Sequence, residues 1–262
     1  MMEKIENINL DEVFNKQEDY IDDKAVGHYK NDGKLYLIDR KNKVAYLLPE
    51  KYQNTKIILY HPCGGYDDSG MIMVSLLGDI ELSYYHDLSD TAGMWGWIDL
   101  DGNEVITPKY VYAMNFFGDY AIVCKGDWTV DSNGKYWCNN EQWGVIDKNE
   151  KEVVPIKYDD EITFVSEDKV AVKDGHFEDD KWIDGTWRVF DIKQGKEIFT
   201  TEDSLRYSEY KDGYLTICDS ECHIYLYDFE TDTYLFNGEK YDEIEIVGRD
   251  KFVKTKDDRS NN

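Results

Sequence analysis

A phrase of five residues occurs twice in this chain, as WGWID at residues 95–99 and as WGVID at 143–147. The same pattern recurs three more times in weaker form, because an aspartate follows an apolar run and a large apolar residue stands four positions before it. The five pairs are Leu35 and Asp39, Trp95 and Asp99, Trp143 and Asp147, Trp187 and Asp191, and Ile224 and Asp228. Recurrence at this spacing is the signature of an internal repeat, so the chain is predicted to be built from copies of one unit.

Further features follow each aspartate in the same order. A turn-like stretch comes first, then a second apolar run, then a basic residue followed by tyrosine, and finally a strand-like run. The basic–tyrosine pairs are Lys51-Tyr52, Lys109-Tyr110, Lys157-Tyr158, Arg206-Tyr207 and Lys240-Tyr241. Four features that recur in one order across five copies predict five units, at about 31–92, 93–140, 141–184, 185–221 and 222–256.

Each feature has a physical interpretation that favours strands. The WGxID run alternates between two faces, as a strand does. Gly96 and Gly144 weaken such a strand unless a group packs close against the bare backbone, and we expect a neighbouring aromatic ring there. The aspartate can accept hydrogen bonds from turn amides, and the tyrosine can bury its ring with its hydroxyl bonded. The proline after the second run is expected to end pairing. The sequence thus predicts four strands per unit.

These motifs resemble the tandem WG repeats of bacterial proteins. The resemblance is close over residues 93–173 and weaker over 34–92 and 186–256, where Trp-Gly becomes Leu-Tyr, Trp-Arg or Ile-Tyr. It implies an all-β chain that acts as a binding or scaffold module. It implies no set of catalytic residues, so no active-site residues carry over to this sequence.

Four-stranded units of this length fit the blades of a β-propeller, and five of them would close into a ring without exposed sheet edges. An open, curved stack of the same units is the alternative. Residues 1–30 are expected to form a short helix or an extended arm against the repeat domain at 31–256. Residues 257–262 are expected to be a frayed tail.

The charge of the chain narrows the choice of partners. Its 55 acidic and 30 basic residues give a net charge of −25. Such a surface repels nucleic acid and anionic membranes and attracts basic proteins. A second interpretation is that the charge keeps a protein rich in aromatic residues soluble. The sequence therefore predicts neither nucleic-acid nor membrane binding, and it leaves the oligomeric state open.

Cysteine use and the first residues of the chain bear on its compartment. The chain has 5 cysteines, an odd number without the density of a disulfide framework. Its start, MMEKIENINLDEVF, lacks the apolar core of a secretory signal. A reducing, cytoplasmic location is the expectation that follows.

The junctions between units vary most in length and are the candidate binding face. Insertions at one point of a repeat project from one side of the fold, where binding residues gather. The aromatic candidates in these junctions are Tyr84, Tyr85, Trp128, Tyr136, Trp137, Phe177 and Trp182. The alternative is that each insertion is a longer hairpin whose aromatic residues pair across strands, as Trp128 and Trp137 could.

The search for catalytic and metal sites returns little. Cys218, Cys222 and His223 offer three zinc ligands but lack a fourth, and Cys218 also fits as an inward residue of a strand. His61 and Cys63 lie close in sequence, but the acidic surroundings do not favour a thiolate nucleophile. No cofactor, metal or catalytic residue is predicted.

Three classes of function remain open. The first is a non-enzymatic module that binds a basic protein, for example as an immunity-type inhibitor of a basic toxin. The second is a carbohydrate-active or other hydrolytic propeller with paired carboxylates in a central cleft. The third is a structural repeat protein without a discrete site. The first is the function that the sequence favours.

Overall fold

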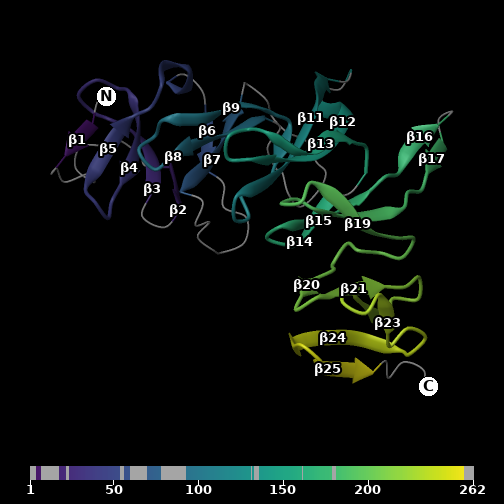
Figure 1. Ribbon diagram of the computed structural model, residues 1–262. Helices are drawn as coiled ribbons and strands as arrows, with labels where there is room; N and C mark the ends of the chain where they lie inside the picture. Colours follow the sequence, from purple (N-terminus) through teal and green to yellow (C-terminus); the bar gives the residue numbers. More distant parts are fainter. Residues whose placement is uncertain are drawn as a thin grey trace. The chain divides into compact units, whose positions relative to one another are not determined.

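The computed structural model (Figure 1) describes most of the chain as antiparallel strands. The residues described are 4–6, 18–21, 24–53, 56–59, 70–77, 93–130, 132, 136–160, 162–178 and 181–256. One short 3-10 turn, Glu50–Tyr52, is the sole helical element within these ranges. The all-β prediction is therefore confirmed. None of the described segments is a helix long and apolar enough to cross a membrane.

The strands follow one another in chain order. The first nine are β1 (Lys4–Glu6), β2 (Glu18–Ile21), β3 (Lys24–His28), β4 (Leu35–Asp39), β5 (Val44–Leu47), β6 (Lys56–Leu59), β7 (Met71–Leu77), β8 (Met94–Asp99) and β9 (Glu104–Tyr110). The next eight are β10 (Tyr112–Ala113), β11 (Tyr120–Val130), β12 (Tyr136–Asp147), β13 (Glu152–Tyr158), β14 (Ile162–Ser166), β15 (Lys169–Lys173), β16 (His176–Glu178) and β17 (Lys181–Ile183). The last eight are β18 (Trp187–Asp191), β19 (Lys196–Thr201), β20 (Tyr210–Lys211), β21 (Tyr214–Cys218), β22 (Ile224–Asp228), β23 (Thr233–Leu235), β24 (Tyr241–Gly248) and β25 (Lys251–Lys256).

The strands form a series of small antiparallel sheets. Four sheets have four strands, in the orders β6-β7-β8-β9, β10-β11-β12-β13, β14-β15-β18-β19 and β20-β21-β22-β23. The first sheet has the order β1-β5-β4-β3-β2, β16 and β17 form a separate hairpin, and β24 and β25 form a two-stranded sheet. Tandem four-stranded antiparallel sheets are therefore the architecture, as predicted. Closure of the sheets into a ring stays a prediction.

The boundaries between sheets do not coincide with those between sequence repeats. The sheet of β14, β15, β18 and β19 takes its first two strands from the third repeat and its last two from the fourth. Hairpin turns and the variable junctions connect strands within a sheet. The segment with the basic–tyrosine pair instead carries the chain to the next sheet, as where β9 ends at Tyr110 and β10 begins at Tyr112. Each basic–tyrosine pair therefore lies at a corner between two sheets.

Apolar side chains fill the space between successive sheets. The chain divides into two compact units, of which the first comprises residues 1–141 and 145–151, and the second comprises 142–144 and 152–262. In the second unit Trp187 and Val189 of β18 pack in one cluster with Leu215 and Ile217 of β21. A neighbouring cluster joins β21 and β22 to the final pair β24–β25, drawn in yellow in Figure 1. Since burial of apolar area is the main favourable term in folding, these sheets of the second unit stabilise one another.

The two glycines of the WG motif allow a close approach of backbone, and not of an aromatic ring as the sequence suggested. A Cβ added at Gly96 would lie 2.5 Å from the nitrogen of Pro108, and one added at Gly144 would lie 2.7 Å from the Cα of Ile156. Pro108 lies inside β9, where the pairing with β8 has a register shift. The expectation that proline ends the strand is thus wrong for this repeat, because a bulge on an edge strand tolerates the missing N–H.

The N-terminal region contributes strands where the sequence allowed a helix or an arm. Residues 4–6 pair with β5, and residues 18–21 pair with β3, so both join the first sheet. The predicted tail at 257–262 lies outside the described residues.

Candidate binding groove and the clamps between repeats

The aspartate that ends each first strand organises the turn after it. Oδ1 of Asp99 accepts hydrogen bonds from the backbone N–H groups of Asp101 and Asn103, at 3.0 and 2.7 Å. Asp147 does the same for the N–H groups of Asn149 and Lys151, at 2.9 Å each. A carboxylate that bonds two turn amides holds the hairpin in shape, which is the role the sequence predicted for it.

The tyrosine of the basic–tyrosine pair reaches forward into the next repeat. The hydroxyl of Tyr52 donates to Oε2 of Glu104 at 2.8 Å, and the hydroxyl of Tyr110 donates to Oε1 of Glu150 at 3.1 Å. Both tyrosine rings are buried. Each accepting glutamate belongs to the hairpin after the first strand of the following repeat, so the bond joins neighbouring repeats at the corner between their sheets.

The lysine beside each tyrosine strengthens this contact. Lys51 forms an ion pair with Glu104, and Lys109 forms one with Glu150. Their ammonium groups also lie over the adjacent rings, 5.2 Å from the centroid of Tyr52 and 5.6 Å from that of Tyr110. We call the lysine, the tyrosine and the glutamate of the next hairpin a clamp.

The hydrogen bonds of the first clamp change the acidity of its glutamate. Burial acts to raise the pKa of Glu104, but hydrogen bonds from Lys51, Thr107 and Tyr52 outweigh it and hold this pKa below its usual value. The glutamate therefore stays ionised, which charge-assisted bonding requires.

The third clamp is open. Lys157 lies 5.3 Å from the ring centroid of Tyr158, as in the closed clamps. Among the described residues, however, no hydrogen bond joins the Tyr158 hydroxyl to Glu197, the glutamate of the next hairpin. NH1 of Arg188 pairs with Glu197 at 3.2 Å instead, while Nε of the same arginine binds Asp174 at 2.6 Å. An arginine of the fourth repeat has thus taken the acceptor that the clamp would use.

A groove of about 740 Å³ lies at this open clamp. It follows the corner between β13 and the hairpin of β18 and β19, and it lies wholly within the second compact unit. Four carboxylates line it against two cationic side chains, together with two aromatic rings. The lining residues are Val153, Pro155, Lys157, Tyr158, Asp159, Asp174, Gly175, His176, Arg188, Phe190, Asp191, Ile192, Gly195 and Glu197.

Aromatic and acidic groups meet in the groove. The rings of Tyr158 and Phe190 are tilted at 58° with their centroids 6.4 Å apart. Asp159 is exposed at the groove, next to Tyr158 in the chain. Burial raises the pKa of Tyr158, although the nearby Arg188 acts against this rise. The tyrosine therefore stays a neutral ring at physiological pH, beside carboxylates that a cation would meet.

The carboxylate that Arg188 binds is unsuited to act as an acid. Burial acts to raise the pKa of Asp174, but hydrogen bonds from the Arg188 guanidinium and the Thr186 N–H outweigh it and hold this pKa below its usual value. A glycosidase acid needs a raised pKa. The groove is consequently better suited to binding than to general acid catalysis.

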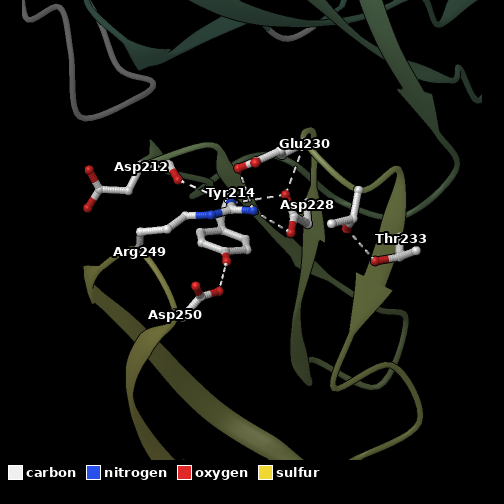
Figure 2. A network of polar contacts seen from close by, with 8 residues as sticks. Asp212, Tyr214, Asp228, Glu230, Thr233, Arg249 and Asp250 are labelled. Atoms are coloured by element: carbon white, nitrogen blue, oxygen red, sulfur yellow. Dashed lines mark hydrogen bonds and ion pairs between the residues drawn. The ribbon is translucent and has the colours of Figure 1, made fainter.

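The last sheet of the chain is held by a clamp of a different composition (Figure 2). Arg249, in the turn between β24 and β25, makes two bonds to the buried Asp228, at 3.0 and 2.9 Å. Its guanidinium lies 4.3 Å from the ring centroid of Tyr214, and the Tyr214 hydroxyl donates to Asp250 at 2.7 Å. These contacts fasten the turn of the C-terminal hairpin to the preceding sheet.

The positions predicted from the repeat are mostly buried. Trp95 and Trp187 are each 3% exposed, Trp143 is half-buried, and Tyr241 is 4% exposed. The three tryptophans occupy the same place, at or near the start of the WGxID run in the third strand of their sheets. The remaining positions predicted from the repeat are Gly96, Asp99, Tyr110, Gly144, Asp147, Tyr158, Asp191 and Asp228. Asp191 accepts bonds from the backbone and side chain of Gln194, both at 2.8 Å.

Tyr207 corrects one of these predictions. Its side chain is 92% exposed, so it does not bury its ring as Tyr52, Tyr110 and Tyr241 do. Leu205, two residues earlier, is fully buried in the cluster between the sheets of the fourth repeat. The buried position thus belongs to leucine in this copy.

The predicted aromatic face falls largely outside the described side chains. Tyr84 and Tyr85 lie outside the described residues. Tyr136, Trp137, Phe177 and Trp182 lie in strands, and their side chains are not described. Phe177 and Trp182 are directly opposite each other in the hairpin β16–β17. Trp128 packs edge-on against Tyr112 of its own sheet and donates to the carbonyl of Gly93, just before β8 of the preceding sheet, at 3.0 Å.

The described cysteines offer little chemistry. Burial, and then the charge of Glu141, raises the pKa of Cys138 to about 12, and burial raises that of Cys218. Such thiols stay protonated and are poor nucleophiles. No group of three or more potential metal ligands gathers among the described residues, Cys218 and His223 included. Cys63 lies outside them.

Sequence reasoning missed the acceptors of the clamps. Glu104, Glu150 and Glu197 each follow a repeat aspartate within six residues, which is the signal that could have found them. Arg188 replaces the glycine of the WG motif in the fourth copy. That substitution could have marked this junction as different from the others.

The comparison with family models decides the identity of the repeats. The model described as WG containing repeat matches residues 95–127 and 143–182. These stretches are WG repeats. The second match covers the end of β12, all of β13 and the residues that line one side of the groove, so the open clamp is a feature of a WG repeat and its successor. No curated protein matches the sequence.

Solved structures show distant similarity to this chain. Apo AztD from Citrobacter koseri is 11% identical, with a TM-score of 0.35 and with 84% of this chain and 70% of that chain covered. An uncharacterised protein from Listeria monocytogenes is 12% identical, with a TM-score of 0.36 and with 87% and 66% covered. BamB from Moraxella catarrhalis is 13% identical, with a TM-score of 0.31 and with 89% and 73% covered. Similarity at this level carries no argument about function.

Proposed function

We propose that the protein is a non-catalytic binding module for a basic protein partner and that the groove at the open clamp receives a cationic side chain of that partner. The observation that carries the proposal is the lining of the groove, where four carboxylates and two aromatic rings outnumber two cations. An arginine or lysine entering there meets Asp159 and the rings of Tyr158 and Phe190. Carboxylate pairing and cation–π contact both favour such a group.

The net charge of −25 supports the same partner class. A strongly acidic surface speeds the encounter with a basic protein and repels nucleic acid. An immunity-type inhibitor of a basic toxin is one form that this function would take. The hydrolytic alternative is less well supported, since the lowered pKa of Asp174 opposes a role in proton donation.

The test is the binding of a fluorescein-labelled, arginine-rich peptide, followed by fluorescence anisotropy. Asp159→Lys places a cation at the groove. We expect it to weaken binding at least about fivefold, because one favourable charge contact is lost and a repulsive one is gained. The matched control is Glu202→Lys, which makes the same charge change at an exposed position outside the groove.

Two outcomes separate site binding from general attraction. If the groove is the site, the control retains affinity within about twofold, and the difference between the variants persists as salt is raised through the range where exposed charges are screened. Equal weakening by both substitutions would show that the peptide is attracted by net charge alone and would refute the groove as the site.

A further inference from the structure

Two free thiols lie at the hairpin that joins β21 to β22. Cys218 ends β21, and Cys222 stands in the turn, two residues before β22 begins at Ile224. The N–H of Asp219 donates to the carbonyl of His223 at 2.9 Å, and the N–H of Cys222 donates to the carbonyl of Asp219 at 3.0 Å. These two bonds close the turn, so the two cysteines, four residues apart in the sequence, are held on either side of it.

The carboxylate of Asp219 fixes the shape of this turn. Its Oδ1 accepts hydrogen bonds from the N–H groups of Glu221 and His223, both at 2.8 Å, in the manner of Asp99. Cys222 lies between these two donors with a φ of 65°, a left-handed conformation that is uncommon for a residue with a side chain. The backbone is therefore held on both sides of Cys222, which also fixes the direction of its side chain.

The side chains of the two cysteines meet at the turn. The thiol of Cys218 donates to the carbonyl of Asp219 at 3.6 Å, so its sulfur lies toward the turn. Burial raises the pKa of Cys218, and the charges of Cys222 and Asp219 and a hydrogen bond between the two thiols add to the rise. Thiols that hydrogen bond to each other need only a small movement to reach the geometry of a disulfide.

The two thiols differ in their access to solvent. Cys222 is exposed, whereas Cys218 is half-buried. A reagent from solution therefore reaches Cys222 first, and Cys218 is placed to react with what forms there. Redox-active cysteines in proteins are often an accessible thiol beside a second, resolving thiol. Within the described part of the chain no group of three metal ligands includes this pair, so disulfide chemistry suits it better than metal binding.

We propose that Cys218 and Cys222 form a site of reversible thiol–disulfide exchange with low-molecular-weight disulfides of the glutathione type. The thiolate of Cys222 attacks one sulfur of that disulfide and forms a mixed disulfide, and the displaced thiolate takes up the proton that Cys222 gave up. Cys218 then loses its proton and attacks the sulfur of Cys222, which breaks the mixed disulfide and releases the second small thiol. The protein loses two electrons and two protons, and the small disulfide gains both.

The probe is glutathione disulfide, added to the folded chain at neutral pH, with alkylation of the remaining thiols and peptide mapping by mass spectrometry. We expect the wild type to acquire a disulfide between Cys218 and Cys222 without retaining glutathione. Cys218→Ser should retain glutathione on Cys222, because the resolving thiol is gone. Cys222→Ser should be modified at Cys218 at least about tenfold more slowly, because that thiol is half-buried. Glutathione retained on Cys222 of the wild type, or no reaction at either thiol, would overturn the proposal.

A measurement in urea separates the effect of the folded hairpin from that of the sequence spacing. Cysteines four residues apart can also join in an unfolded chain, so the ratio of internal to mixed disulfide is compared between the folded and the unfolded wild type. We expect this ratio to be at least about tenfold higher in the folded chain, because the turn holds the thiols together before they react. Equal ratios would show that the hairpin contributes nothing and would overturn the proposal.

Discussion

Tyr110 donates a hydrogen bond to Glu150, which lies 40 residues later in the hairpin of the next WG repeat. The same relationship joins Tyr52 to Glu104. A tyrosine that ends one sheet thus bonds the hairpin that belongs to the next. This hydrogen bond fixes the corner between sheets because it is directional, whereas the burial of apolar side chains is not.

Gly144→Ala should destabilise the protein by about 1–3 kcal/mol, the usual cost of forcing a methyl group into packed structure. The new Cβ would lie 2.7 Å from the Cα of Ile156, and backbone cannot give way as a flexible side chain can. Urea denaturation measures the change. Gly248→Ala is the matched control, since a Cβ there meets nothing within 4 Å. Equal losses for both variants would mean that close strand packing is not the reason for the glycine.

Arg249→Met should loosen the C-terminal hairpin. The substitution keeps the length of the side chain but removes both bonds to Asp228 and the cation over Tyr214. The carboxylate of Asp228 then stays buried without its guanidinium, which is unfavourable. We expect faster hydrogen exchange in residues 241–256 and little change in residues 93–130. Lys240→Met, at an exposed lysine, should leave exchange in the hairpin as in wild type; a similar acceleration by both variants would contradict the role of Arg249.

Asp168 should make stability depend on pH in the acid range. A hydrogen bond from Lys169, opposed by burial and aided by Ser166 and Lys193, lowers the pKa of Asp168 to about 2. The unfolded chain binds this proton near pH 4, so the stabilisation is full above that pH and is lost as pH falls from about 4 to 2. Asp168→Asn should flatten the fall in urea midpoint over this window. An unchanged slope of urea midpoint against pH would show that Asp168 does not cause the loss of stability.

The sequence predicted the elements of the fold better than their grouping. The alternation in WGVID and the turn signals around Asp147 specify strands and hairpins locally, so strand order was predictable. The division of each repeat between two sheets was not. It depends on the corner at Tyr110, which forms only when the next hairpin is in place.

The candidate site was predictable only in part. The lysine–tyrosine pairs stood out as a recurring motif, but their acceptors did not, because Glu150 and Glu197 are two among many acidic residues. At the open third clamp Arg188 replaces the WG glycine, and its effect depends on three-dimensional neighbours, Asp174 and Glu197. The sequence also directed attention to aromatic residues in the junctions, whereas Trp128 is held by structural contacts with Tyr112 and the carbonyl of Gly93.

The central claim is that the clamp is closed between the second and third repeats and open between the third and fourth, which leaves the groove. Double-mutant cycles in urea denaturation test this directly, with Tyr110→Phe and Glu150→Gln in one cycle and Tyr158→Phe and Glu197→Gln in the other. We predict a coupling energy of about 1 kcal/mol for the first pair and about zero for the second. Equal coupling in the two cycles, or none between Tyr110 and Glu150, would contradict the account.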